Sequence, residues 1–209
     1  MIQTNNLTFH YKKEKHLFSF PNIDLKEREN LLILGKSGIG KTTLLHLLAG
    51  LLTPISGKVV VGGVDIHSIS YSELDKFRGQ NIGLVFQKKH AIQSLNVVEN
   101  LHARLFLSRK PISNTIIDFL LEQLDVSDCK TSTINTLSEG QSQRLSIAMA
   151  VVHNPQVILA DEPTSSLDDA NCKVVIELLI KQAKLTNANL IVITHDHRIK
   201  PLFSNSITL

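Results

Sequence analysis

Nine consecutive residues have the composition and spacing of a phosphate-binding loop. They are Gly35, Lys36, Ser37, Gly38, Ile39, Gly40, Lys41, Thr42 and Thr43, and they contain the pattern G-x-x-x-x-G-K-[ST]. Glycines have no Cβ, so the backbone can turn tightly and direct several N–H groups at one anion. In this pattern the lysine reaches the outer phosphates of a nucleotide, and the hydroxyl that follows it ligates Mg²⁺. The spacing therefore predicts a nucleoside triphosphate site rather than a glycine-rich turn that binds nothing.

Two acidic residues follow an apolar run elsewhere in the chain. Residues 157–160 read Val-Ile-Leu-Ala and lead directly into Asp161 and Glu162. A carboxylate at position 161 can hold Mg²⁺ through water, opposite Thr42. Glu162 can orient and polarise the water that attacks a γ-phosphate, because such reactions depend on positioning and charge stabilisation. The alternative is a solvated acidic loop, but the strand-like run and the phosphate loop favour the catalytic interpretation.

Two more polar residues end apolar runs. Gln87 follows 82–86, and His195 comes just after 190–193. The amide of Gln87 can reach a metal ion or the attacking water, and the imidazole of His195 can donate to a γ-phosphate oxygen. Either residue alone is weak evidence, since a glutamine after a strand is commonly polar surface and a histidine there is commonly structural.

The stretch Leu137 to Gln141 predicts a helix start and a second anion site. Ser138 and Gln141 have the spacing of a capping box. A capped helix N-terminus that also offers a hydroxyl and Gly140 can receive an anion. Two chains paired head to tail would then sandwich each nucleotide between the loop of one chain and residues 138–140 of the other.

Alternating strands and helices must position these residues. We expect strands at 2–11, 16–20, 31–34, 58–61, 82–86, 157–160, 190–193 and 207–209, and helices at 41–49, 71–78, 97–107, 116–124, 145–152 and 174–185. This alternation predicts an α/β fold with a mostly parallel central sheet. Ligands of such sheets lie at the carboxyl ends of the strands, where the polar residues above are found. We expect one domain over 1–209, with its core at about 1–86 and 136–209.

The remaining interval, at about 87–135, is expected to be a helical subdomain without a strand.

Composition limits the function further. The chain has 209 residues, 43% of them hydrophobic, and a net charge of +3, which is too mild to indicate a nucleic-acid partner. Cys129 and Cys172 stand in no metal-ligand pattern and are expected to be free thiols in a reducing compartment. No run approaches the length of a membrane span and no signal peptide is evident, so we expect a soluble chain or one docked to another protein.

The ordered motifs resemble those of the ATP-binding subunit of an ABC transporter. Residues 35–43 resemble the Walker A loop, Gln87 the Q-loop glutamine, 137–141 the signature motif and 157–162 Walker B with its catalytic glutamate. Residues 165–168, ending at Asp168, resemble the D-loop, and His195 the switch histidine. Tyr11 matches the aromatic residue that stacks on adenine in this family, although a strand-end tyrosine is the alternative. The fold implied is a P-loop NTPase with an N-terminal antiparallel β subdomain and a helical subdomain.

The resemblance implies a mechanism. ATP and Mg²⁺ are the implied ligands, with two ATP molecules bound between the subunits of a homodimer that closes on ATP and reopens after hydrolysis. Movement would pass through the Q-loop and the helical subdomain to separate integral-membrane permease subunits. The protein would then be cytoplasmic and peripheral on the inner face of the cell membrane.

Within the superfamily the chain is most similar to small ATPases of lipoprotein release, macrolide or antimicrobial-peptide export, and cell division. Two departures stand out: Glu139 replaces the usual glycine of the signature, and the chain stops soon after His195. The second departure argues against sugar-importer ATPases. A regulator that signals to a membrane partner would keep every motif and remains an alternative. A DNA-repair ATPase would carry a long coiled coil, and a translation factor a second cassette; neither is present.

Overall fold

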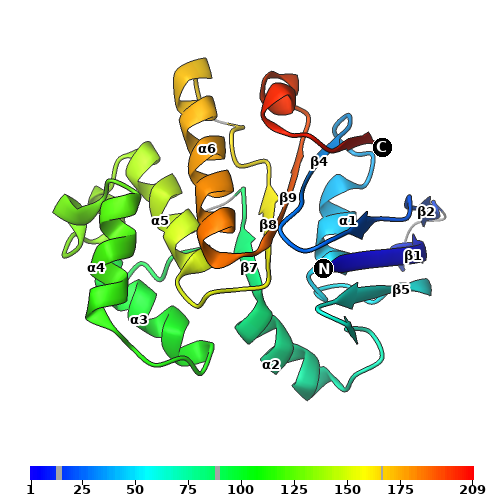
Figure 1. Ribbon diagram of the computed structural model, residues 1–209, viewed down its shortest axis with the longest axis horizontal. Coiled ribbons are helices and arrows are strands. Elements are labelled where there is room, and N and C mark those ends of the chain that lie inside the picture. Colours follow the sequence, from blue (N-terminus) through cyan, green and yellow to red (C-terminus); the bar gives the residue numbers. More distant parts are fainter. Residues whose placement is uncertain (13–15, 88–89, 166) are drawn as a thin grey trace.

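The structure is a computed structural model that describes residues 1–12, 16–87, 90–165 and 167–209. Its centre is a sheet whose neighbouring strands all pair in parallel (Figure 1). In spatial order the strands are β10 (Ser206–Thr208), β4 (Asn30–Leu34), β9 (Asn189–Thr194), β8 (Val157–Asp161) and β7 (Ile82–Val85). The prediction of a mostly parallel central sheet is confirmed.

A second, antiparallel sheet is built mainly from the N-terminal part of the chain. Its path is β2 (Phe18–Ser19), β1 (Ile2–Phe9), β5 (Ser56–Val61) and β6 (Val64–Asp65), and β3 (Asp24–Leu25) also pairs with β1. The α-helices are α1 (Lys41–Leu48), α2 (Tyr71–Asn81), α3 (Val97–Leu107), α4 (Asn114–Gln123), α5 (Glu139–Val151) and α6 (Asp169–Thr186). Short 3₁₀ helices are η1 (Ser127–Cys129), η2 (Ile134–Thr136) and η3 (His197–Leu202).

The apolar strands of the parallel sheet are buried on both faces. Because successive side chains of a strand point to opposite faces, Leu32 and Leu34 of β4 join one apolar cluster and Leu31 and Ile33 join another. The first cluster contains α5 and α6, and the second contains α1 and the antiparallel sheet. This two-sided burial explains why the strands read as continuous hydrophobic runs.

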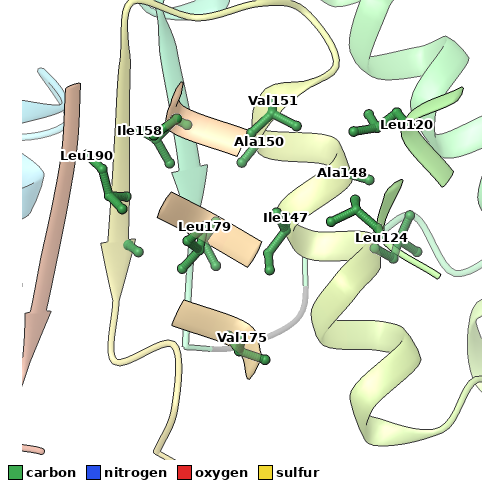
Figure 2. Packing of buried hydrophobic residues seen from close by; sticks show 14 of the residues in the cluster. Leu120, Leu124, Ile147, Ala148, Ala150, Val151, Ile158, Val175, Leu179 and Leu190 are labelled. Carbon is green, nitrogen blue, oxygen red and sulfur yellow. The ribbon is translucent and has the colours of Figure 1, made fainter. Parts of the chain in front are cut away.

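Helices α3 and α4 lie beyond α5, on the side away from β1 and β5 (Figure 1). They share the first apolar cluster with the central sheet. Figure 2 shows Ile147 of α5 pointing toward Leu179 of α6, while Leu120 and Leu124 lie on the opposite side of α5. Helix α5 thus connects the sheet layer to the helical segment. Between residues 90 and 135 the described chain consists of helices joined by turns and irregular segments; it contains no strand, apart from one isolated bridge between Asn96 and Thr133.

Several predicted boundaries were wrong, and two helix starts share one reason. The helices expected at 145–152 and 174–185 begin earlier, at Glu139 and Asp169. Their first turns are polar, so the apolar periodicity starts later than the helix, whereas the caps Ser138 and Asp168 fix the true starts. The strand expected at 2–11 ends at Phe9, the one at 16–20 shortens to Phe18–Ser19, and the one at 82–86 ends at Val85, while α2 runs to Asn81 rather than Arg78.

Two expectations about the chain can be compared with the described residues: the membrane span and the state of the cysteines. None of the helices in this part of the chain has both the length and the apolar character of a membrane span. The two cysteines are buried free thiols, as predicted.

Candidate functional site

Parallel strands bring the predicted polar residues to one edge of the central sheet. The loop after β4, Gln87 after β7, Glu162 after β8 and His195 after β9 all border one cavity of about 640 Å³. Its lining is completed by the residues Tyr11, Phe18, Lys36, Ser37, Gly38, Gly40, Lys41, Thr42 and Thr43. Gly35, Ile39 and Asp161 are not part of that lining, although Gly35 and Asp161 contact residues that are. The cavity lies where α/β sheets bind ligands.

The N-terminus of α1 faces this cavity without a side-chain cap. Every other α-helix in the described chain has a side-chain cap, provided by Ser70, Asn96, Ser113, Ser138 or Asp168. The first N–H groups of an α-helix have no partner within the helix, and the helix dipole adds partial positive charge there. Helix α1 therefore leaves these groups available to an anion in the cavity.

Gly40, the N-cap of α1, is required at its position for two reasons. Its φ angle is +105°, a conformation that side chains rarely adopt. A Cβ at this position would also lie 2.7 Å from Cδ1 of Phe18, which is closer than real Cβ contacts. The aromatic ring of Phe18 thus packs directly against the phosphate loop.

Lys41 is the charged centre of the loop. Its side chain is 6% exposed, and Nζ donates to the carbonyl oxygens of Gly35 at 2.8 Å and Lys36 at 3.1 Å. The same ammonium lies 3.4 Å from Oε1 of Glu162. The loop carbonyls therefore hold the lysine between the helix N-terminus and the acidic residue that follows β8.

Glu162 is held by residues from the neighbouring strand β9. Oγ1 of Thr194 donates to Oε2 of Glu162 at 2.7 Å, and Nδ1 of His195 lies 3.0 Å from both carboxylate oxygens. A nitrogen that donates to a carboxylate must carry a proton, so Nδ1 is protonated in this contact. The ring can donate from Nε2 as well only when it is doubly protonated. The imidazole is 60% exposed, so its second nitrogen is reachable from the cavity.

Opposing influences set the charge of Glu162. Burial by itself raises its pKa, but hydrogen bonds from His195 and Thr194, together with the charge of Lys41, outweigh burial and lower the pKa below its ordinary value. The carboxylate is therefore ionised at neutral pH. Its backbone φ is +47°, an uncommon angle for a residue with a side chain, and conformations of this kind are typical of functional sites.

Thr42 and Asp161 offer oxygen ligands suited to Mg²⁺. Oγ1 of Thr42 donates to Oδ1 of Asp161 at 3.3 Å. Mg²⁺ prefers oxygen ligands, so a hydroxyl and a carboxylate this close together suit one ion, which Asp161 can hold through water. Burial raises the pKa of Asp161, and the hydrogen bond from Thr42 opposes that rise. No group of three or more His, Cys, Asp or Glu residues in the described chain has metal-ligand geometry. An ion here would depend on these oxygens and on a bound phosphate.

Two aromatic rings from the N-terminal part of the chain, those of Tyr11 and Phe18, border the cavity. The hydroxyl of Tyr11 lies 2.9 Å from Oγ1 of Thr43, and the Tyr11 ring meets the ring of Phe9 edge to face at 4.9 Å. Phe18 meets Tyr11 edge to face at 6.3 Å. The strand register explains this grouping, because Phe9 pairs with Phe18 across β1 and β2.

The predicted signature motif lies at a different place from the cavity. Ser138 and Gln141 form the predicted capping box: Ser138 Oγ accepts from Gln141 N at 3.2 Å, and Gln141 Oε1 accepts from Ser138 N at 2.9 Å. Glu139 and Gly140 are exposed at the start of α5. A Cβ at Gly140 would meet no atom within 4 Å. The chain by itself therefore does not bring the signature to the phosphate loop.

The structure describes the predicted D-loop, residues 165–168, except for Ser166. Asp168 caps α6 by accepting from the N–H of Asn171 at 2.8 Å. Ser165 is exposed, and Ser166 lies outside the described residues.

Two residues of the site were not predicted from the sequence. The sequence pattern marks Thr194 only as the residue before His195, yet its hydroxyl holds Glu162 directly. Its position at the end of an apolar strand, next to a predicted site residue, was an available signal. The sequence pattern marks Phe18 only as a strand residue, and its contact with the loop depends on the pairing of β1 and β2.

Comparison with known proteins gives consistent matches. The profile of the family described as "ABC transporter" matches residues 19–165. The lipoprotein-releasing system ATP-binding protein LolD of Buchnera aphidicola subsp. Schizaphis graminum is 36% identical over 203 residues, which cover 95% of this chain and 89% of that protein. LolD of Syntrophus aciditrophicus is 34% identical over 214 residues, covering 100% of this chain and 96% of that protein.

Solved structures agree with the sequence comparison. A bacterial ABC transporter cassette solved as a dimer superposes with a TM-score of 0.89 at 31% identity, covering 100% of this chain and 94% of that chain. The same cassette in a post-hydrolysis state bound to ADP and Pi also superposes with a TM-score of 0.89.

Proposed function

Since this chain belongs to the ABC transporter family, as an ATP-hydrolysing subunit that acts as a dimer, we propose that it powers a membrane complex of the lipoprotein-releasing type. The observation that carries the residue assignments is the convergence of the uncapped start of α1, Lys41 and Glu162 in one cavity. The relatives named LolD, which are ATP-binding proteins of lipoprotein-releasing systems, support lipoproteins as the substrate class. Their likeness extends over nearly the whole chain, including the regions outside the phosphate loop.

ATP binding uses the loop and α1. The phosphates lie against the N–H groups of residues 38–43, and Lys41 turns from the loop carbonyls to the outer phosphates. The adenine lies against the ring of Tyr11, with Phe18 beside it. Thr42, Asp161 and Gln87 would hold Mg²⁺, which when bound neutralises charge on the phosphate oxygens.

Hydrolysis uses the pair of Glu162 and His195. The ionised carboxylate of Glu162 accepts a hydrogen bond from the attacking water and so orients and polarises it. Thr194 and His195 keep the carboxylate in place, and Nε2 at the exposed edge of His195 donates to a γ-phosphate oxygen when the ring carries both protons. Lys41 stabilises the charge that develops on the same phosphate.

The second half of each site comes from the partner protomer. Ser138 uses its oxygen as a cap acceptor, which leaves its hydroxyl proton free to donate to a phosphate. Gly140 has open space around it, so a phosphate can approach the start of α5 closely. Each ATP is then held between the loop of one protomer and the signature of the other.

Glu139 is expected to weaken this closure, because its carboxylate stands where the γ-phosphate of the partner's ATP approaches. Replacing Glu139 by Gln removes the repulsion and should tighten ATP-dependent dimerisation about 3- to 10-fold. The same change should lower the stability of the single chain by about 0.3–1 kcal/mol, because Glu139 lies in the first turn of α5 and favours the helix dipole.

Sedimentation velocity with ATP measures the first effect, and urea unfolding measures the second. Glu122→Gln, an exposed position of α4, is the matched control. Weaker dimerisation of the Glu139→Gln protein would show that the carboxylate makes an attractive contact in the dimer instead.

A groove beside the Q-loop is suited to the membrane partner. It has a volume of about 400 Å³ and lies between α2, β7, α3 and α5. Its lining includes Phe86, next to Gln87, and Leu107, which is 68% exposed at the end of α3. A cytoplasmic segment of a permease that fills this groove would contact both the Q-loop and the helical segment, which supports transmission through these elements.

Replacing Leu107 by Glu should abolish co-purification of the membrane chains and leave ATP hydrolysis by the free protein unchanged. An exposed leucine contributes little to folding, so stability should change by less than about 0.5 kcal/mol. Leu185→Glu, also exposed but on α6, is the matched control. Full retention of the partner by the Leu107→Glu protein would place the docking surface elsewhere.

The function itself is tested with the tagged protein purified from detergent-solubilised membranes. We expect permease chains with a large outer domain to co-purify, and the reconstituted complex to release a membrane-anchored lipoprotein only when ATP is hydrolysed. Co-purification with a division protein, without any ATP-driven release, would instead identify a regulator. Absence of phosphate release from the complex with Mg²⁺ and ATP would contradict the assignment as an energy-coupling ATPase.

A further inference from the structure

Asp196, which directly follows His195, joins three parts of the chain through one carboxylate. Its Oδ2 accepts from Oγ1 of Thr164 at 3.2 Å and from Sγ of Cys172 at 3.4 Å. Both of its oxygens also accept from the guanidinium of Arg198, at 2.9 Å from Nε and 2.8 Å from Nη2. The side chain of Asp196 is only 9% exposed. The carboxylate therefore binds the segment after Glu162, helix α6 and its own loop at once.

Arg198 extends this network to the first turn of α6. Its Nη1 contacts Oδ1 of Asp169, while Nε and Nη2 remain on Asp196. Asp169 follows Asp168, the cap of α6 and the last residue of the D-loop segment. The fork of Arg198 thus fixes the distance between the loop that carries His195 and the start of α6.

The network is continuous with the ATP site. Oγ1 of Thr194 accepts from the N–H of Asp196 at 3.0 Å and donates to Oε2 of Glu162 at 2.7 Å. On the other side, Nε2 of Gln143 in α5 donates to the carbonyl of Pro163 at 3.0 Å. Residues 162–164 are therefore held between α5 and the loop after β9. A displacement of Glu162 or His195 has a short, hydrogen-bonded route to Asp169.

The ion pairs of Arg198 are expected to contribute little to the stability of the fold. Arg198 is 44% exposed, and exposed ion pairs commonly contribute about 0–1 kcal/mol. The Arg198 fork is the main cause that lowers the pKa of Asp196, so the carboxylate stays charged throughout the range in which the protein works. A charge held this firmly by groups from three segments fixes geometry more than it stabilises the fold.

We propose that Asp196 and Arg198 are positioning residues that hold the His195 loop to the start of α6, so that occupation of one ATP site is communicated to the predicted D-loop segment before α6, which this proposal places against the partner protomer. The proposal rests on the dimer described under the proposed function. Arg198 touches no nucleotide in this scheme, and it acts on hydrolysis only through Asp196 and Asp169.

The test compares Arg198→Ala, Arg198→Lys and Asp169→Asn in the full-length protein. Arg198→Ala should leave the affinity of the single chain for a fluorescent ATP analogue within about twofold, because the cavity is untouched. It should lower kcat about 10-fold, because His195 and Glu162 are then less precisely positioned. It should also reduce the Hill coefficient for ATP from near two toward one, because binding at one site no longer changes affinity at the other. Asp169→Asn should reproduce the loss of cooperativity with a smaller fall in kcat. Arg198→Lys, which keeps the charge but loses the fork, should be intermediate.

Lys173→Ala is the control. It removes an exposed cation from α6, the helix that also carries Asp169, and the carboxylate partner of Lys173, Glu177, lies 3.8 Å away. Unchanged cooperativity and kcat in the Arg198→Ala and Asp169→Asn proteins would overturn the proposal. So would a loss of ATP affinity in proportion to a loss of thermal stability, which would indicate only a structural role. If the wild-type protein itself fails to dimerise on ATP, the proposed function fails and this inference fails with it. A wild-type dimer that is indifferent to Arg198→Ala overturns the inference alone.

Discussion

Replacement of Glu162 by Gln is expected to reduce the rate of ATP hydrolysis by on the order of 10² to 10³ while ATP still binds. The amide has the same shape as the carboxylate and can accept the hydrogen bond from Thr194, which is 2.7 Å long in the wild-type protein. What is lost is the negative charge that polarises the attacking water. The ion pair with Lys41, at 3.4 Å, is lost as well, and this frees the ammonium for the phosphates.

The consequence for the assembly is a dimer that closes on ATP and does not reopen. Release of phosphate under single-turnover conditions measures the chemical step, and gel filtration with ATP and Mg²⁺ measures the trapped dimer. Glu177→Gln is the matched control, because that glutamate is 54% exposed on α6 and pairs only loosely with Lys173 at 3.8 Å. Wild-type turnover in the Glu162→Gln protein would show that another residue positions the water.

The second large effect is expected when Lys41 is replaced by Ala. Affinity for ATP should fall by about 10- to 150-fold, because a charge-assisted hydrogen bond to a phosphate in a buried site contributes about 1.5–3 kcal/mol. The side chain is 6% exposed and opens onto the cavity, so no other cation of the described lining can take its place at the outer phosphates without moving.

Equilibrium dialysis against ATP measures the affinity, with Lys130→Ala as the control, since that lysine is 50% exposed and pairs with Asp118. The Lys41→Ala change also leaves Glu162 without its cation, so thermal unfolding must be followed in parallel. Lys41→Met keeps the apolar stem of the side chain and separates loss of charge from loss of packing. Unchanged ATP affinity in a folded Lys41→Met protein would exclude the role given to this lysine.

Both predictions depend on features that the sequence reveals only in part. The phosphate loop was recognisable because its information is local: the glycine spacing, the lysine and the apolar runs on either side are contiguous. The parallel sheet was predictable for the same reason, since strands such as β4 are apolar at nearly every position. The polar first turns of α5 and α6 were missed because a helix that begins with polar residues shows no apolar periodicity there.

The sequence by itself therefore determined the family, the fold class and the identity of the loop, carboxylates and histidine at the edge of the sheet. The tertiary structure alone decided how these groups meet: that Lys41 faces Glu162, that Thr194 holds the same carboxylate, and that Arg198 reaches Asp169. Such contacts join residues far apart in the chain. They depend on strand register and on the direction of each side chain, and packing of the whole domain fixes both.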